Sequence, residues 1–207
     1  MKRSHMNTTS LVLIGLLFFS CMANAQSRYG VKAGVNLANH HKTVAIGPVP
    51  PMTQKTEPFV GYQLGGFYKT NLHKDFSLSA EINFSVIGSR MTLTAPDGNS
   101  YNTNDKLGYI ELPLMVEYTV KKIYFGLGPS VGFKIFSKLT HFENNTYDIT
   151  YYQNWDVAGN IKAGYAFSDK LDVNVRYSYG LLNIYKYSGG ISTKNRFINL
   201  SFLYYLN

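Results

Sequence analysis

Nine charged side chains are the residues of this 207-residue chain that could do chemistry together. Each stands between two apolar or aromatic neighbours, and the nine are Lys32, Glu81, Glu111, Glu117, Lys134, Asp156, Lys162, Asp172 and Arg176. Four are basic and five are acidic, which is close to charge balance. Because an unpaired charge away from bulk water is costly, we expect these groups to pair with one another.

A catalytic role would require a Ser/His/Asp set, a metal cluster or a pair of carboxylates facing a substrate groove. The histidines are poorly placed for such a role, because His40 and His41 are adjacent in a predicted loop, His73 is in a turn and His141 is in another loop. Exposed loop histidines are usually solvated rather than bound to metal. We therefore expect no catalytic, cofactor-binding or metal site, and an enzyme is the lowest-ranked interpretation.

The elements that must position the nine charges are strands, because the sequence repeats with a period of two. From residue 76 to residue 86 every even position is apolar and every odd position is polar. A helix would not keep that phase. The same period returns in seven other segments, at residues 29–37, 60–68, 110–118, 123–133, 157–167, 171–179 and 198–206. Each segment is about as long as a tilted strand needs to cross a bilayer, and the charges lie on the polar parity.

The connections between these segments alternate between long and short. The long ones are residues 38–58, 89–106, 136–154 and 182–195, and the short ones are residues 71–75, 119–122 and 168–170. Outer-membrane barrels have short periplasmic turns and long external loops. The alternation of long and short connections therefore predicts an all-β fold, an eight-stranded antiparallel up-and-down transmembrane β-barrel with short periplasmic turns and long extracellular loops.

Aromatic residues on the apolar parity fit this orientation. Those beside the short turns predict an aromatic belt at the periplasmic boundary: Tyr29, Tyr68, Phe76, Tyr118, Phe167 and Tyr204. A soluble lipocalin-like barrel would turn the apolar face inward around a ligand. The other face consists mostly of Gly, Ser and Asn, which are too small to coat an exterior in water, so the pattern favours the membrane.

The width of the barrel bears on the role of its charged interior. Eight strands enclose a space just wide enough for side chains to fill. A porin would line an open bore with one sign of charge, whereas the nine charges here are mixed. We therefore predict a plugged lumen and a structural or interaction role, with Glu111 and Arg176 as candidates for the centre of the network. A narrow, passive porin-like channel is the alternative.

The first 25 residues have the pattern of a secretory signal peptide. A start with two basic residues precedes an apolar run at residues 11–19, about half the length of a membrane-spanning helix. The small residues Ala23 and Ala25 suit cleavage before Gln26. Lipidation at Cys21 is the alternative. Cleavage after Ala25 would remove this cysteine, the only one in the chain, and with it any disulfide or thiolate chemistry.

The expected organisation is a cleaved signal peptide at residues 1–25 and an outer-membrane β-barrel domain at residues 26–207. The mature protein would reach the bacterial outer membrane after export through the periplasm. The formal charge of the chain is +8, but its basic residues form no run, so we expect no nucleic-acid partner. The expected partners are outer-membrane lipid and the barrel-assembly machinery.

The long loops are the surface on which a further partner could bind. They combine tyrosine with scattered positive charge, at Tyr147, Tyr151, Tyr152, Tyr185, Tyr187, Lys42, Lys55, Lys138, Lys186 and Lys194. This composition suits contact with a protein or with an anionic surface glycan. The alternative is that the tyrosines merely extend the outer aromatic belt.

Three segments resemble the PorT-like family of small outer-membrane protein β-barrel domains, also called porin-family proteins. They are Tyr-Ile-Glu-Leu-Pro-Leu at 109–114, Gly-Leu-Gly-Pro-Ser-Val-Gly at 126–132 and Arg-Tyr-Ser-Tyr-Gly-Leu at 176–181. The resemblance implies an outer-membrane barrel without catalytic residues, and one relative is tied to protein secretion. The chain departs from many such barrels by ending in Leu206-Asn207 rather than in Phe, which bears on how its last strand signals to the assembly machinery.

Overall fold

The computed structural model describes residues 27–44, 53–94, 100–141, 145–148, 152–185 and 191–207. These residues form β1 (Ser27–Val44), β2 (Thr53–His73), β3 (Phe76–Thr94), β4 (Ser100–Val120), β5 (Ile123–His141), β6 (Asn145–Asp148), β7 (Trp155–Ala166), β8 (Leu171–Gly180) and β9 (Ile191–Tyr205). Among the described residues, no helix is long and apolar enough to cross a membrane.

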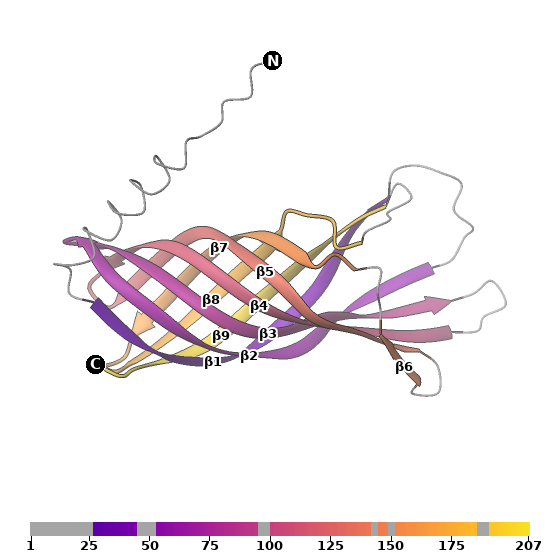
Figure 1. Ribbon diagram of the computed structural model, residues 1–207, viewed down its shortest axis with the longest axis horizontal. Helices are drawn as coiled ribbons and strands as arrows, with labels where there is room; N and C mark the ends of the chain where they lie inside the picture. The colour runs from indigo at the N-terminus through magenta and orange to yellow at the C-terminus, as the bar shows by residue number, and fades with distance from the viewer. Residues whose placement is uncertain (1–26, 45–52, 95–99, 142–144, 149–151, 186–190) are drawn as a thin grey trace, which may run out of the picture.

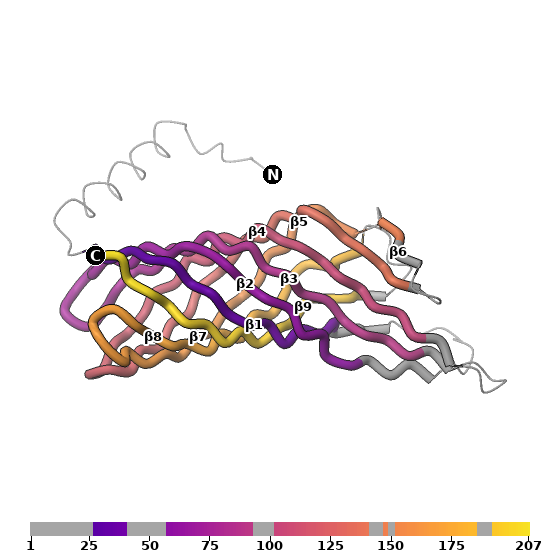
Figure 2. The backbone as a smooth tube through the Cα atoms, turned by 90° about the horizontal axis from the view of Figure 1, so that it is seen from below, coloured from indigo at the N-terminus to yellow at the C-terminus, as the bar shows by residue number. Residues whose placement is uncertain are grey.

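Eight of the strands close into a ring in which every neighbouring pair is antiparallel (Figures 1 and 2). The ring runs β1–β2–β3–β4–β5–β7–β8–β9 and closes where β9 pairs with β1. The short strand β6 lies outside the ring, because it pairs only with the end of β5 at residues 138–141. The predicted eight-stranded up-and-down barrel is therefore confirmed.

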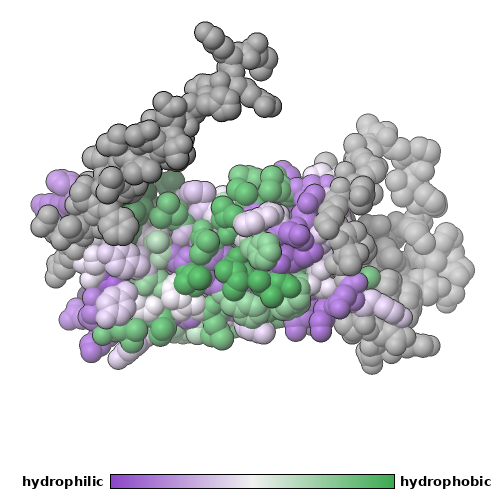
Figure 3. Space-filling model, in the orientation of Figure 1, coloured by the Kyte–Doolittle hydropathy of each residue, from purple (hydrophilic) through white to green (hydrophobic). Residues whose placement is uncertain are grey.

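The polarity of the barrel is the reverse of a soluble protein's. Arg176 on β8 is 0% exposed, whereas Leu127 on β5 is 67% exposed. Apolar side chains gather in a band around the middle of the molecule, with polar ones towards both ends (Figure 3). The side chains follow the period-two pattern of the sequence, since successive residues of a strand point to opposite faces. The apolar parity points outward.

The three short turns and both ends of the described chain lie at one end of the barrel, the predicted periplasmic end (Figure 1). Leu206 donates its backbone N–H to the carbonyl of Tyr29, which ties the last strand to the first. The β4–β5 turn consists of Lys121 and Lys122, and Lys121 has a positive φ of 55°. Such a left-handed residue suits a two-residue hairpin turn.

The strands reach much further than predicted at the opposite, extracellular end. Most of the segments predicted as long loops are strand: β1 continues to Val44 and β2 starts at Thr53, while β3 continues to Thr94 and β4 starts at Ser100. The hairpins continue because the backbone ladders continue, as in the pairing of Met91 with Thr103. Period-two hydrophobicity marks only strands with one apolar face, so it does not reveal these extensions.

Candidate functional site in the barrel interior

A chain of five alternating charges crosses the interior of the barrel. Lys32 on β1 contacts Glu81 on β3 at 2.7 Å, and Glu81 also contacts Lys162 on β7 at 3.1 Å. Lys162 lies 2.5 Å from Glu117 on β4, which is 2.8 Å from Lys69 on β2. We call these five residues the central ion-pair chain. It joins strands from different sides of the ring and blocks the interior with paired side chains.

A glycine leaves space for the side chains of the central ion-pair chain. Gly126 on β5 is paired with Glu117 on one side and with Lys162 on the other. A Cβ atom on Gly126 would lie 3.2 Å from Cγ of Glu117 and 3.4 Å from Cε of Lys162. The missing side chain therefore lets the lysine reach the carboxylate across an intervening strand.

A second layer of polar contacts is built around Glu111 and Arg176, the residues proposed as the centre of the network. The Arg176 guanidinium lies 3.2 Å from the Glu111 carboxylate. This carboxylate also accepts hydrogen bonds from Ser85 at 2.7 Å and from Gln63 at 3.1 Å. Arg176 lies 5.4 Å from the centre of the Phe197 ring, a cation–π geometry. The two residues pair with each other, while the central ion-pair chain runs through Glu81 and Lys162.

Three of the predicted lumenal charges meet neutral partners. Asp172 accepts a hydrogen bond from the Tyr205 hydroxyl at 2.8 Å, and Asp156 accepts one from the Asn195 amide at 2.7 Å. Lys134 donates to the backbone carbonyl of Tyr152 at 2.9 Å. Each of these side chains is buried or half-buried. Hydrogen bonds of this kind reduce the cost of holding a charge away from water.

Lys69 belongs to the network but is absent from the nine residues selected on the sequence. It follows directly after the predicted strand 60–68, on the parity that faces the interior. Adding Lys69 brings the set to five basic and five acidic groups. A strand prediction longer by one residue would have included it.

The extracellular end of the interior holds a group of apolar and aromatic side chains beside the buried Asp105 and His40. We call this group the outer cluster, and its buried members are Ala38, Ile87, Leu107, Tyr109, Tyr152, Ile184 and Phe197. Five of them come from the strands, whereas Tyr152 and Ile184 come from the connections after β6 and β8. These connections join through Gln153, whose N–H donates to the carbonyl of Ile184 at 2.7 Å. The described parts of both connections thus pack inside the extracellular end of the barrel.

Tyr152 shows how firmly the connection after β6 is held. It was predicted at an external surface, but it is 1% exposed and stacks on Tyr185 with ring centres 5.0 Å apart. Its hydroxyl donates to the Asp105 carboxylate at 2.8 Å. Burial, followed by the charge of Asp105, raises the pKa of Tyr152 above its ordinary value. The neutral hydroxyl therefore stays available as a hydrogen-bond donor.

The space between the outer cluster and the polar layers is small. A cavity of about 10 Å³ lies between Tyr109, Glu111 and Asn195. A cavity of that size holds about one water molecule. Ion pairs, hydrogen-bonded side chains and the outer cluster thus fill successive levels of the interior.

The two candidate histidines with described side chains, His40 and His73, lie at opposite ends of the barrel strands. The His40 side chain is buried, with Nε2 3.8 Å from the Asp105 carboxylate, and the side chain of His41 lies outside the described residues. His73 lies at the end of β2 and is exposed. Within the parts of the chain that the structure describes, no group of three His, Cys, Asp or Glu side chains is arranged to hold a metal ion.

The predicted belt residues lie at the periplasmic end. Five of the six point outward and are exposed, namely Tyr29, Phe76, Tyr118, Phe167 and Tyr204. Tyr68 is half-buried, and its hydroxyl donates to the Ser27 hydroxyl at 2.7 Å. The rings of Phe76 and Tyr118 lie 5.0 Å apart. Aromatic side chains at this depth suit a membrane–water boundary.

A closed ring of eight antiparallel strands, apolar outside and ion-paired inside, defines a small outer-membrane β-barrel. The chain belongs to the outer membrane protein beta-barrel domain family, whose model matches residues 23–186. The protein therefore resides in the bacterial outer membrane.

Solved structures of similar proteins share little sequence with the chain. Ail, the attachment invasion locus protein of Yersinia pestis, crystallised with the heparin analogue sucrose octasulfate, is 11% identical, with 87% of this chain and 99% of that chain covered and a TM-score of 0.47. Neisserial surface protein A is 10% identical, with coverage of 85% and 96% and a TM-score of 0.49. OprG from Pseudomonas aeruginosa is 12% identical, with coverage of 87% and 94% and a TM-score of 0.37. No curated protein matches the chain in sequence.

Proposed function

We propose that the barrel is a closed membrane anchor for an extracellular binding surface, and that it is neither a pore nor an enzyme. The observation that carries this proposal is the filled interior. The central ion-pair chain blocks the barrel at one level and the outer cluster blocks it at another. An open bore would need a continuous wetted path, and the ion pairs that join four buried charges and the half-buried Lys69 argue against such a path at their level.

Electrical recording tests the closed interior directly. The mature protein, refolded in detergent and added to a planar lipid bilayer, should produce no stable conductance steps. A general porin of known conductance, added to the same bilayer, provides the positive control. Reproducible stepwise channels from the folded protein would contradict the proposal and favour the porin-like alternative.

The extracellular surface that we propose for binding lies on the extensions of β4 and β5. Lys106 and Lys138 are directly opposite each other on these strands, and both are exposed. Like charges in this arrangement destabilise a sheet, and an anion bridging them offsets that cost. Asp148 on β6 lies opposite Lys138 on its other side and limits the positive charge. An anionic surface glycan fits this pair better than a neutral one.

Heparin serves as an anionic polysaccharide probe of this surface. We expect the wild-type protein to bind it with a strong dependence on salt, and Lys106→Gln/Lys138→Gln to bind roughly tenfold more weakly. Lys121→Asn/Lys122→Gln removes the same charge from the periplasmic turn and should bind like the wild type. If the two double variants bound heparin equally, the glycan proposal would be wrong. A protein would then remain as the partner of the extracellular loops.

Two finer assignments also belong to this proposal. The segments at 109–114, 126–132 and 176–181 favour a PorT-like member of the family. Residues 1–25 fit a cleaved signal peptide, and they lie outside the described residues. Sequencing the N-terminus of protein purified from outer membranes would test the cleavage site, since the first residue should be Gln26.

A further inference from the structure

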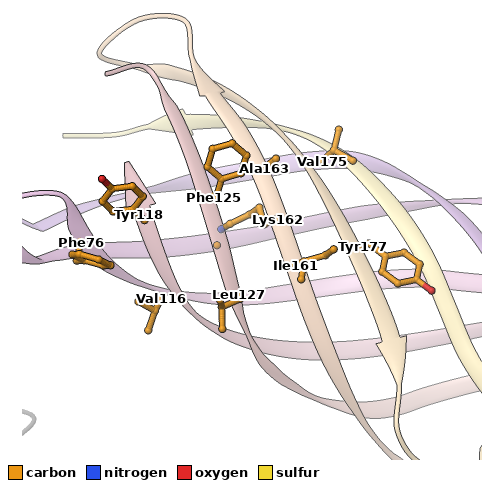
Figure 4. A pocket seen from close by; sticks show the side chains of 11 residues that line it. Phe76, Val116, Tyr118, Phe125, Leu127, Ile161, Lys162, Ala163, Val175 and Tyr177 are labelled. Atoms are coloured by element: carbon orange, nitrogen blue, oxygen red, sulfur yellow. The ribbon is translucent and has the colours of Figure 1, made fainter. Parts of the chain in front are cut away.

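An apolar groove lies on the outer surface of the barrel, across β4, β5, β7 and β8 (Figure 4). Its volume is about 500 Å³. Tyr118 and Phe125 line it on one side and Val175 and Tyr177 on the other. Lys162 borders the groove with its backbone, because its charged end points into the interior and bonds to Glu81 and Glu117.

The groove exists because one outward side chain is small. The register places Tyr118, Phe125, Ala163 and Val175 side by side on four successive strands of the ring. The single methyl group of Ala163 stands between the ring of Phe125 and the branched side chain of Val175. A hollow is therefore built into a surface that is covered mostly by large apolar side chains.

The position of the groove along the strands places it in one leaflet of the membrane. It begins at Phe76 and Tyr118, which belong to the periplasmic belt, and extends towards the middle of the barrel. It therefore faces the inner leaflet of the outer membrane. Its mostly apolar walls suit a hydrocarbon chain, and its volume is comparable with that of one long fatty acyl chain.

Two cations stand just below the groove. Lys121 and Lys122 are both exposed, and they form the turn that joins β4 to β5. The turn begins three residues beyond Tyr118 and Phe125, or roughly 10 Å along the strands. The carbonyl of Lys122 accepts a hydrogen bond from Ala166 at 2.8 Å, which fixes the turn beside β7. The two ammonium groups therefore lie at the depth of lipid headgroups.

A second outer groove provides a comparison within the same molecule. It has a volume of about 390 Å³ and centres on Ala33, between Leu64 and Phe202. The turn at its periplasmic side contains Asp169 and Lys170, whose charges cancel. The two grooves share a small residue among large ones, but the turn beneath Ala163 has two adjacent lysines, whereas the turn beneath Ala33 places Asp169 beside Lys170 and Arg28.

We propose that the groove at Ala163 is a binding site for one anionic diacyl phospholipid of the inner leaflet. One acyl chain lies over Ala163, and the phosphate lies between Lys121 and Lys122. The site is on the outside of the barrel, so it is independent of the closed interior and of the extracellular surface proposed above.

Native mass spectrometry of the mature protein in mild detergent tests this site. The probes are phosphatidylglycerol and phosphatidylethanolamine with identical acyl chains, added at matched concentrations. We expect the wild type to retain one phosphatidylglycerol in preference to phosphatidylethanolamine. Lys121→Asn/Lys122→Gln should lose roughly tenfold in affinity for phosphatidylglycerol and keep its affinity for phosphatidylethanolamine. Asn at position 121 tolerates the positive φ of the turn.

Filling the groove provides the second arm of the test. Ala163→Trp should reduce retention of both lipids, whereas Ala33→Trp, the same change in the second groove, should leave retention unchanged. Faster gel migration of unheated protein selects the variants that fold, and if Ala163→Trp does not fold, the charge variant decides alone. Equal retention by the two tryptophan variants, or no loss in the charge variant, would overturn the proposal and indicate nonspecific boundary lipid.

Discussion

The part of the barrel within the membrane and the part beyond it have opposite polarity. On β4, the outward residues Leu112 and Leu114 are apolar and the inward Glu111 is charged. Further along the same strand, the inward Leu107 is fully buried in the outer cluster and the outward Lys106 is exposed. The polarity of the two faces inverts because lipid surrounds one part of the barrel and water surrounds the other. One strand thus carries a membrane-type pattern and a soluble-type pattern in succession.

The two parts also close their interiors by different physical means. Within the membrane, paired charges and hydrogen bonds fill the space, and the sum of charges is near zero. Beyond the membrane, the outer cluster fills much of the space through hydrophobic burial, beside buried polar groups such as Asp105 and His40. A substitution should therefore have opposite consequences in the two parts, and three pairs of variants test this comparison.

The largest effect is expected in the central ion-pair chain. Glu81→Ala leaves Lys32 and Lys162 without their shared carboxylate. Breaking a buried ion pair in this way costs about 3–5 kcal/mol of unfolding free energy. Denaturant unfolding in lipid vesicles, followed by the fluorescence of Trp155, the only tryptophan in the chain, measures the loss.

The matched control for this variant replaces both partners. Lys32→Met/Glu81→Met removes one charge of each sign and leaves Lys162 paired with Glu117. Its stability should lie within about 1 kcal/mol of the wild type, because apolar replacement of a whole buried pair is often neutral. A double variant as unstable as Glu81→Ala would show that side-chain shape, rather than charge pairing, maintains the interior.

An intermediate effect is expected where a charge is placed towards lipid. Leu114 points outward on β4 and is 46% exposed, so Leu114→Arg should destabilise the barrel by about 2–4 kcal/mol. Ser79→Ala, on the inward face of β3, should be mild by comparison. Equal losses of unfolding free energy at the two positions would contradict the assignment of the faces.

The smallest effect is expected where an exposed charge beyond the membrane is replaced by an apolar side chain. Lys106→Leu removes an exposed cation that faces Lys138, and its effect on unfolding free energy should stay within about 0.5 kcal/mol. The same measurement on Leu107→Ala, one residue along, should show a loss of about 2–5 kcal/mol, because Leu107 is fully buried. Similar values for the two variants would mean that the polarity does not invert on this part of β4.

The inversion explains which features the sequence could reveal. Between residues 76 and 84 the apolar parity is constant and faces outward, so the strand, its faces and its inward Glu81 were all predictable. Val86 keeps the apolar parity but is fully buried, next to an irregularity in the pairing of β2 with β3. Beyond the membrane, Ile87 and Leu107 take the inward parity, and the alternation that identifies a strand is interrupted. The extensions of β3 and β4 were therefore predicted as loops.

The folding of the connections into the barrel had no local signal at all. Tyr152 and Ile184 have no periodic neighbours, and their burial depends on contact with strands far away in the sequence. The identity of the individual ion pairs was also out of reach, because it depends on the stagger of strands around the ring. The charge balance of the interior required only composition and parity, and for that reason it could be predicted.

The central claim, a filled interior whose polarity inverts at the membrane surface, can be measured along β4 alone. Single cysteines at positions 104–118, in protein lacking Cys21, would carry a nitroxide label in lipid vesicles. Electron paramagnetic resonance would then compare collisions with oxygen, which concentrates in lipid, and with a water-soluble nickel complex. For a filled interior, we expect oxygen access at even positions from 110 to 118, nickel access at 104 and 106, and little access of either reagent at odd positions. Nickel access at odd positions within the membrane would show an open, wetted lumen and contradict the account.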